Sequence, residues 1–401
     1  MIAAFRPRFD RLRPAVRPFT DVYTAHMVRH HLRFVVVTFV VILAAVTAIN
    51  VSAEVTRVWD EGLNGGDTAT AIGRTALYVW CRLLDNGSQI FGIAFMLGIV
   101  WAEVAHAFGG RLLMVRTAGR SFVHRSSALL IVAALSVPTH FVLDNVVRPW
   151  AFMTLSREGL GEYGWRYAAA RSHGVRWLSF AGAILQVDLH DAPEPRFEKA
   201  TIYWFDQTGD LVRLASAEEI VPPSRTNHRW MLRGATVWQI GEPSNPSFGM
   251  PIARGDGAAG ETALELGFSI SRRWLEFRDI EPKYLPLSEL WALTGDPDLP
   301  NNRPKYEEWL SIRLFQGMVP GLVAVCIGAL FALAIDARGL VVAGGAALFT
   351  AYSGYFLNRL SALAVENMPL PPQITALLLP SLLVWAMLRL IDRIRRRDGL
   401  V

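Results

Sequence analysis

FVVVTFVVILAAVTAINVSA, residues 34–53, carries no charged side chain from its first residue to its last. About 20 consecutive apolar residues are what an α-helix needs to cross a bilayer. The "VSA" before Glu54 also fits a signal-peptide cleavage site, which is the rival interpretation. Residues 1–33 precede the stretch, however, and its apolar core is longer than the roughly 7–15 residues of a signal peptide. We therefore expect an uncleaved membrane anchor.

The rest of the chain repeats this pattern. The protein is 52% hydrophobic and only 19% charged, and its apolar residues are clustered; soluble domains are about 25% charged. The second stretch is short, and it lengthens if its helix begins nearer Leu77. We expect five more membrane spans, at Gln89–Ala102, Ser126–Leu143, Leu314–Ile335, Gly339–Tyr355 and Met368–Leu388.

Arginines set the predicted orientation. Loops rich in arginine stay on the cytoplasmic side of a membrane. Three arginine groups fall on one side of the six predicted spans, so we expect both termini to be cytoplasmic. The groups are Arg6, Arg8, Arg11, Arg13, Arg17, Arg29 and Arg33; Arg111, Arg116, Arg120 and Arg125; and Arg389, Arg393, Arg395, Arg396 and Arg397.

The segment between the third and fourth spans has β character. "RWLSFAGAILQVDL" alternates in part and precedes the turn-forming "HDAPEP", while "ATIYWFDQTGDLVRLASAEEI" predicts two strands joined at Asp206–Gly209. "HRWMLRGATVWQIG" and "ETALELGFSISRRW" predict two more strands, and "LSELWALTG" predicts a short helix with Ser288 as a possible N-cap. We expect an all-β sandwich or roll on the non-cytoplasmic side. The predicted segments are a basic cytoplasmic N-terminal segment (1–33), membrane helices 1–3 (34–148), the β domain (149–308), membrane helices 4–6 (309–388) and a basic cytoplasmic tail (389–401).

Catalytic motifs are missing from the sequence. A phosphate-binding P-loop needs a lysine after glycine, and the three lysines follow Glu198, Pro282 and Pro304. "GDGAAG" (255–260) is interpreted as a flexible loop, and Cys81 and Cys326 have no zinc or disulfide spacing. His26 and His30 have no third ligand nearby and suit an interfacial basic helix better than a metal site.

Two further groupings leave alternatives open. His140 and Asp144 stand four residues apart and suit either a proton or ion relay or a pair hydrated at the membrane surface. Asp188, His190 and Asp191 form the best cluster for a rival hypothesis, a membrane-anchored enzyme acting on envelope lipid or glycan, although they resemble a turn. A scaffold that recruits envelope machinery is a third possibility.

"GGRLLMVRTAGRS" (109–121) interrupts two apolar spans. Phe108, Leu112, Val115 and Gly119 fall on one stripe of a helix, and a glycine can end such a helix. The segment is either a simple orientation signal or a docking helix. Because the chain has no nucleotide site, we favour a small helix, within about 103–121, that docks on a soluble ATPase.

The chain resembles the LptF/LptG permeases of lipopolysaccharide export over nearly its whole length. The motifs are "DVYTAHMVRHHLRF", "RTAGRS", "VVRPWA" and "IYWFDQTGDL" followed by "WMLRGATVW", in this order. The resemblance implies a permease that is not itself an enzyme, six membrane helices in two sets of three, and an inserted periplasmic β-jellyroll. It implies an inner-membrane location and a lipopolysaccharide or related lipid substrate, with another envelope lipid as the alternative.

The resemblance also implies partners. They are a second permease of the family, a cytoplasmic ATPase dimer that binds ATP and Mg²⁺, and a membrane-anchored periplasmic jellyroll protein with a bridge protein. No cofactor or metal in this chain and no nucleic acid is expected. The implied ATPase-coupling residues are Glu103, Phe108, Arg111, Leu112, Val115, Arg116, Gly119 and Arg120.

Lipid-cavity and gate residues are implied by the same resemblance. The first and fifth spans would form lateral gates. The candidates are Asn50, Arg57, His140, Arg148, Gly344, Gly354 and Arg359. Two departures from the family stand out. Arg111 occupies the place of a glutamate that contacts the ATPase, and Arg57 is outnumbered by neighbouring acids where some members carry lysines. Arg148 and Arg359 would either replace those lysines or extend to the membrane surface.

Overall fold

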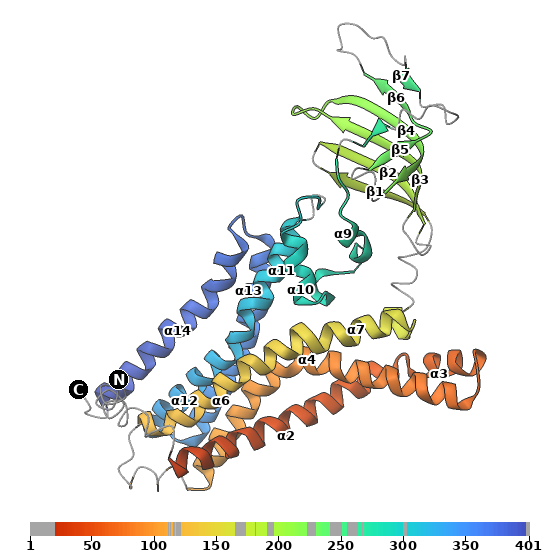
Figure 1. Cartoon of the computed structure of the whole chain (residues 1–401). Helices are drawn as coiled ribbons and strands as arrows, with labels where there is room; N and C mark the ends of the chain where they lie inside the picture. Colours follow the sequence, from red (N-terminus) through yellow and green to blue (C-terminus); the bar gives the residue numbers. More distant parts are fainter. Residues whose placement is uncertain are drawn as a thin grey trace, which may run out of the picture. The chain divides into compact units, whose positions relative to one another are not determined.

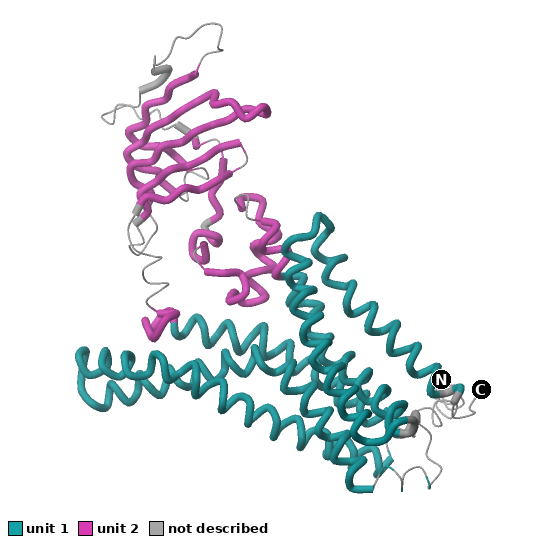
Figure 2. Tube along the Cα trace, turned by 180° about the vertical axis from the view of Figure 1, so that it is seen from behind, with its two compact units in different colours: residues 1–155, 310–401 teal, residues 156–309 magenta. Residues whose placement is uncertain are grey.

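A computed structural model describes residues 21–110, 112, 114, 117, 122–164, 174–180, 182–190, 196–222, 230–240, 251–254, 264–266, 268–278, 280–299 and 303–397. The chain divides into two compact units (Figure 2). The helical unit comprises residues 1–155 and 310–401, and the sheet-bearing unit comprises residues 156–309.

Six helical spans in the described part of the chain are long and apolar enough to cross a membrane, as predicted. The first, α2 (Val22–Ser52), begins well before the predicted Phe34, because no glycine or proline interrupts the residues between them. α4 (Thr68–Phe108) extends far beyond the predicted Gln89–Ala102. Its first turn is capped by Asp67, whose carboxylate accepts a hydrogen bond from the Thr70 amide at 2.9 Å.

A short helix, α3 (Val55–Asn64), joins these two long helices and packs against α4. Glycine is required at their contact, because a Cβ on Gly62 would lie 2.7 Å from the Cα of Ala71. The connection between the first two spans is therefore a folded helical hairpin.

The third span has an irregular turn inside it. α6 (Phe122–Val142) runs through a π-helical turn, η1 (Leu143–Val147), into α7 (Arg148–Arg157). The predicted end at Leu143 was wrong, because the helix passes Pro149 after a π-helical turn, where i→i+5 hydrogen bonds replace the usual i→i+4 pattern. π-helical turns often occur at functional sites.

The last three spans follow the strands in the chain. α11 (Arg303–Phe315), η3 (Gln316–Met318) and α12 (Val319–Arg338) form the fourth span. Gly339, at a φ of 82°, turns the chain into α13 (Leu340–Asn367), and α14 (Pro372–Arg397) ends the described residues. The fourth span extends beyond its predicted bounds at both ends, whereas α13 and α14 extend only beyond their predicted C-terminal ends and begin slightly later than predicted.

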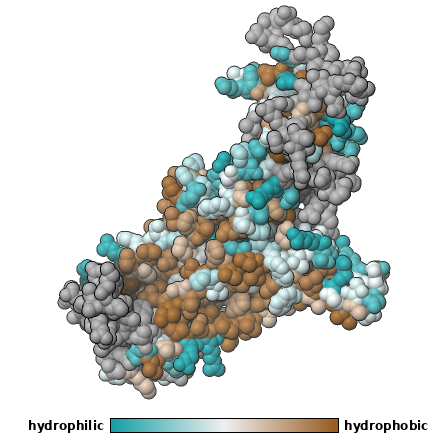
Figure 3. Space-filling view, viewed as in Figure 1, coloured by the Kyte–Doolittle hydropathy of each residue, from teal (hydrophilic) through white to brown (hydrophobic). Residues whose placement is uncertain are grey.

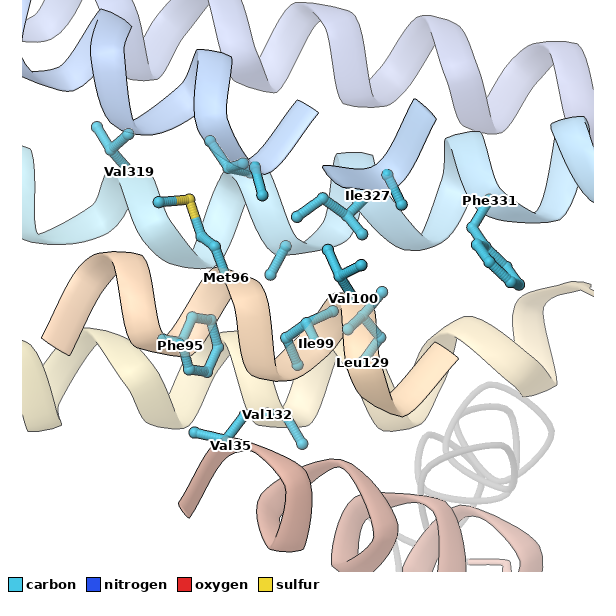
Figure 4. Packing of buried hydrophobic residues seen from close by; sticks show 14 of the residues in the cluster. Val35, Phe95, Met96, Ile99, Val100, Leu129, Val132, Val319, Ile327 and Phe331 are labelled. Atoms are coloured by element: carbon cyan, nitrogen blue, oxygen red, sulfur yellow. The ribbon is translucent and has the colours of Figure 1, made fainter. Parts of the chain in front are cut away.

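The core of the helical unit lies between α4 and α12 (Figure 4). Met96 and Val100 of α4 point toward Val319 and Ile327 of α12, and Phe95 and Ile99 belong to the same cluster. Val35 of α2 and Val132 of α6 complete the cluster on the other side of α4. The outer surface is also apolar (Figure 3), as expected of helices that face lipid.

The outward faces of the first and fifth spans show this lipid-facing character most clearly. Val37, Val41 and Ile49 of α2, and Val341 and Phe349 of α13, are all exposed. Exposed apolar residues of this density would be unfavourable in water. The helical unit is therefore that of a multi-pass membrane protein.

The described strands form an eight-stranded antiparallel sheet (Figure 1). Its main order is β1-β2-β3-β4-β5-β8, and β6 pairs with β4 and β7. The strands are β1 (Gly174–Phe180), β2 (Ala183–His190), β3 (Arg196–Phe205), β4 (Leu211–Val221), β5 (Met231–Arg233), β6 (Thr236–Gln239), β7 (Pro251–Arg254) and β8 (Leu264–Glu265).

The predicted hairpin at Asp206–Gly209 is confirmed, because β3 pairs with β4 across this turn. Asp206 accepts hydrogen bonds from the amides of Thr208 and Asp210, both at 2.9 Å, which closes the turn. Those two polar contacts explain why this hairpin was visible in the sequence.

Other expectations for this unit were wrong. "RWLSFAGAILQVDL" forms β1 and β2, because Gly182 adopts a φ of 73° and reverses the chain. "HRWMLRGATVWQIG" likewise divides at Gly234, with a φ of 62°. Glycine supplied a turn within each run of strand-forming residues.

The end of "ETALELGFSISRRW" is a helix, α9 (Arg272–Phe277), because Ser271 caps it by accepting a hydrogen bond from the Trp274 amide at 3.1 Å. Ser288 is not an N-cap, since it lies inside α10 (Leu287–Thr294), which follows a 3₁₀ turn, η2 (Pro282–Tyr284). Pro286 takes the cap position of α10.

Candidate functional site

A buried polar pair joins α2 and α4 where α4 approaches its end. His31 Nε2 lies 3.1 Å from Glu103 Oε1, with side-chain exposures of 1% and 14%. The Nδ1 of His31 lies 2.8 Å from the Met27 carbonyl oxygen. Because a carbonyl only accepts, Nδ1 carries a hydrogen, and one further proton is shared between Nε2 and the carboxylate. The pair is neutral overall, which suits an apolar surrounding.

A small pocket adjoins this pair. Its lining includes Met27 of α2, Glu103 of α4, Leu129 of α6 and Gly328 of α12, together with Leu112. We call this part of the helical unit, centred on His31, Glu103 and Leu112, the coupling end. Residues of α2, α4, α6 and α12 thus line the pocket together with Leu112, which belongs to the basic segment 109–121. We call this basic segment the coupling segment.

The coupling segment begins with a sharp turn. α4 ends at Phe108, and Gly110 adopts a φ of 68°, a conformation that glycine reaches without strain. The expectation of one helix over about 103–121 was wrong, because this glycine turn separates Glu103 from Leu112.

The predicted single apolar stripe was also wrong at its start. Phe108 is 82% exposed, whereas Leu112 is 6% exposed and lines the pocket, since the turn places the two side chains in different surroundings. The remaining predicted coupling residues lie outside the described residues. They are Arg111, Val115, Arg116, Gly119 and Arg120.

A buried ionic cluster lies far along α4 from the coupling end. Asp85 is fully buried and accepts from Arg148 at 3.2 Å and from Arg82 at 3.3 Å. Arg148 also bonds to Asp144 at 3.3 Å, and Ser88 donates to the same carboxylate at 3.2 Å. We call this part of the helical unit, centred on Asp85, Asp144 and Arg148, the insert end.

The π-helical turn gives this cluster its geometry, because it carries Asp144 and directly precedes Arg148. The Arg148 guanidinium is therefore held by two aspartates. The predicted His140–Asp144 pair is not formed as a hydrogen bond. Asp144 bonds to Arg148 and Ser88, and the His140 ring packs 5.6 Å from that of Phe91.

Polar contacts between α2 and α4 continue beside this cluster. Asn50 donates to Asn86 at 2.9 Å, and Asn86 donates to Thr47 at 3.3 Å. Asn50 thus ties the two helices together. Arg57 pairs with Glu61 within α3 at 2.9 Å, and both side chains are largely exposed. The nearby acid identified in the sequence is thus the partner of Arg57.

The gate and lipid-cavity candidates on α13 differ in how closely they pack against neighbouring helices. A Cβ on Gly354 would lie 2.7 Å from two atoms of Val323, so glycine permits close contact with α12. A Cβ on Gly344 would make ordinary contact with Val104 at 3.6 Å, and one on Gly345 would meet nothing within 4 Å. Only Gly354 fits the predicted role in close helix packing. Arg359 is exposed, and its Nε lies 3.4 Å from the Tyr355 hydroxyl.

The alternative sites gain no support. Asp188 and His190 lie in strand β2, opposite β3, and not in a turn as expected, because Asp188 pairs in register with Glu198. Asp191 and the "GDGAAG" loop lie outside the described residues. Among the residues described, no three His, Cys, Asp or Glu side chains gather as metal ligands. His30 Nε2 donates to the Ala102 carbonyl oxygen, 3.1 Å away, and so faces α4.

The sequence analysis missed both buried networks. His31 and Asp85 were visible only as isolated polar residues in apolar runs, and such residues inside a membrane usually find a polar partner. That signal could have flagged each residue, although it does not say which helix supplies the partner.

Comparison with known proteins gives one result. A family model described as "Lipopolysaccharide export system permease LptF/LptG" matches residues 29–393. The match covers the sheet and all or most of each of the six spans. No curated protein matches the chain.

Proposed function

The chain belongs to the lipopolysaccharide export permease family LptF/LptG, and on that premise we propose that it takes lipopolysaccharide from the inner membrane and passes it toward the outer membrane. Members of this family are membrane subunits of a transporter and not enzymes. The observation that carries the proposal is the family match over residues 29–393, which spans both units.

The proposed energy source is ATP hydrolysed by a partner. The family belongs to the Lpt ABC transporter, in which a membrane subunit needs a cytoplasmic ATPase. The arginine-rich segments at both ends of the chain and at 109–121 favour a cytoplasmic location by the positive-inside rule. The coupling segment would then meet the ATPase dimer, and the sheet-bearing unit would lie in the periplasm.

Two features of the coupling segment and of Phe108, the last residue of α4 before it, support this docking role. Leu112 is buried in the pocket of the coupling end, which anchors the segment to the membrane helices. Phe108 and Met114 are 82% and 68% exposed, so they offer apolar contacts to a partner. One side chain holds the segment, and the other two are available for binding.

The route of the lipid follows from the same proposal. A second permease of the family would complete a membrane cavity, with α2 and α13 as lateral gates. The sheet, completed as a jellyroll, would hand the lipid to a membrane-anchored periplasmic jellyroll protein and a bridge protein. Arg57 and Arg148 already pair with carboxylates, so Arg359 is the better candidate for lipid phosphate.

Co-purification tests the ATPase partnership. The detergent-extracted chain should bring down an ATPase with a GxxxxGK[ST] phosphate-binding loop, and Phe108→Asp should reduce the recovered ATPase about tenfold, since one desolvated charge at an interface costs more than about 1.4 kcal/mol. Trp291→Asp is the matched control, because Trp291 is 64% exposed in the sheet-bearing unit. A chain that purifies alone, and needs no ATPase to release lipid, would refute the proposal.

A further inference from the structure

The pair His31–Glu103 occupies an unusual place in the helical unit. Glu103 lies five residues before the end of α4 at Phe108, where the coupling segment begins. Its partner lies on a different helix, α2, whose outer surface is mostly exposed. This pair is thus a polar contact between α2 and the helix that leads directly into the segment.

The pocket brings the segment itself to the same place. Leu112 and Glu103 line one pocket, so the segment and the residue that holds α2 border the same small space. The fourth span adds to this contact, because the Cβ that Gly328 lacks would lie 3.7 Å from Glu103 Oε1. The absence of a side chain at Gly328 lets α12 approach the carboxylate closely.

The orientation of the contact between His31 and Glu103 is fixed by hydrogen bonds. The Met27 carbonyl fixes the orientation of the His31 ring through Nδ1, and Nε2 therefore points at the carboxylate. A hydrogen bond in a low-dielectric surrounding is stronger than one in water, and the side chains of His31 and Glu103 are only 1% and 14% exposed. The two helices are therefore expected to move together at this point.

We propose that His31 and Glu103 are positioning residues that transmit movement of the coupling segment to α2. The proposal rests on the proposed function above. A displacement of Leu112 by a docked ATPase would shift Glu103 within the shared pocket, and His31 would carry that shift into α2. Glu103 thus acts inside the bundle, as a link, and not as a contact for the ATPase.

The test measures lipopolysaccharide released per ATP hydrolysed, in liposomes that hold the full chain, its partner permease and the ATPase. Glu103→Met and His31→Leu remove the link and should each lower this ratio about tenfold, while ATP turnover stays within about twofold. The double variant should be no worse than either single one, because all three lose the same contact.

Two further variants separate a link from general packing. Glu103→Gln keeps the size and can donate to Nε2, so its ratio should stay within about twofold of the parent. Thr24→Val removes the buried hydrogen bond between Thr24 and Ser127, 3.1 Å long, which ties α2 to α6; it should leave the ratio unchanged. Should Glu103→Met fail to assemble, Glu103→Asp replaces it, because its shorter side chain withdraws the carboxylate from His31.

The outcomes are distinct. The proposal is overturned if the single variants keep the parent ratio, if lipid release and ATP turnover fall in parallel, or if Thr24→Val lowers the ratio as much as Glu103→Met. Parent liposomes that release no lipopolysaccharide with the ATPase present would instead refute the proposed function. Parent liposomes that release lipid, together with unaffected Glu103→Met liposomes, would refute only the link.

Discussion

The two ends of the helical unit hold α4 to its neighbouring helices in different ways. At the coupling end, one neutral pair, His31–Glu103, joins α2 to α4 beside a pocket. At the insert end, Arg148 bridges two carboxylates, and Asn50 adds a hydrogen bond from α2. Asp85 and Glu103 are 18 residues apart on α4, which corresponds to about 27 Å.

We expect the polar contacts at the insert end to affect mainly the stability of the protein and those at the coupling end to affect mainly the transmission of movement. Removing one member of a buried ionic cluster leaves a charge without compensation, and that cost is large. At the coupling end, Glu103 is partly exposed and lines a pocket, so removing one member of the His31–Glu103 pair is expected to cost less and to change how movement passes between helices. Substitutions at the insert end should therefore unfold the protein, and substitutions at the coupling end should uncouple it.

The largest effect is expected at Arg148. Arg148→Met removes the shared partner of Asp85 and Asp144, and it should lower the free energy of unfolding by about 3–5 kcal/mol. Thermal unfolding in detergent measures this loss. Arg57→Met is the control, because the exposed Arg57–Glu61 pair should contribute at most about 1 kcal/mol. Equal stability of the two variants would show that the insert end is not held by charge.

The next effect is expected at Gly98, which lies between the two ends and closer to the coupling end. A Cβ on Gly98 would lie 2.6 Å from the Cα of Val35, so Gly98→Ala must push α2 away from α4. We expect a loss of about 1–3 kcal/mol in the free energy of unfolding. Gly345→Ala, with nothing within 4 Å, should be neutral or slightly stabilising. A neutral Gly98→Ala would mean that α2 and α4 do not need this close approach.

A smaller effect is expected at Asn50. Asn50→Leu removes the bond to Asn86, which keeps its bond to Thr47, and it should cost about 1 kcal/mol. Chemical denaturation in detergent measures the change. If Asn50→Leu lowered the free energy of unfolding as much as Arg148→Met, the insert end would be stabilised mainly by the Asn50–Asn86 hydrogen bond and not by the ion pairs.

The smallest effect concerns the cap of α4 and depends on pH. Hydrogen bonds from the Thr70 backbone and hydroxyl lower the pKa of Asp67 below its ordinary value. A carboxyl with a lowered pKa stabilises the folded state above its unfolded pKa, and this contribution disappears as the pH falls through the folded pKa. Asp67→Ala should thus melt slightly earlier than the parent at pH 7, and the difference should vanish in acid. A difference that persists there would exclude the cap as its cause.

The membrane helices were predictable from the sequence because lipid imposes a simple rule on length and polarity. Their ends were less predictable. α4 carries Arg82 and Asp85 inside the helix, where these charged residues interrupt the apolar run in the sequence. The burial of Asp85 is compensated by Arg82 and by Arg148, which lies far away in the sequence. Strand turns at Gly182 and Gly234 were missed because nearby strand-forming residues outweighed a single glycine.

The candidate site was predictable in position but not in arrangement. The coupling segment was recognised by its charge and by Leu112, whereas the partner of Glu103 lies 72 residues away on α2. No local pattern encodes that distance. Arg148 was identified as important, yet its aspartate partners come from the π-helical turn and from α4, and only the fold brings them together.

The most direct test of the central claim, that this permease moves lipopolysaccharide with energy from a partner ATPase, is lipid release from liposomes holding the full chain and its partner permease. The account predicts release that requires both ATP and the ATPase and that stops with a non-hydrolysable ATP analogue. Release at the same rate without the ATPase, or no release with every component present, would contradict it.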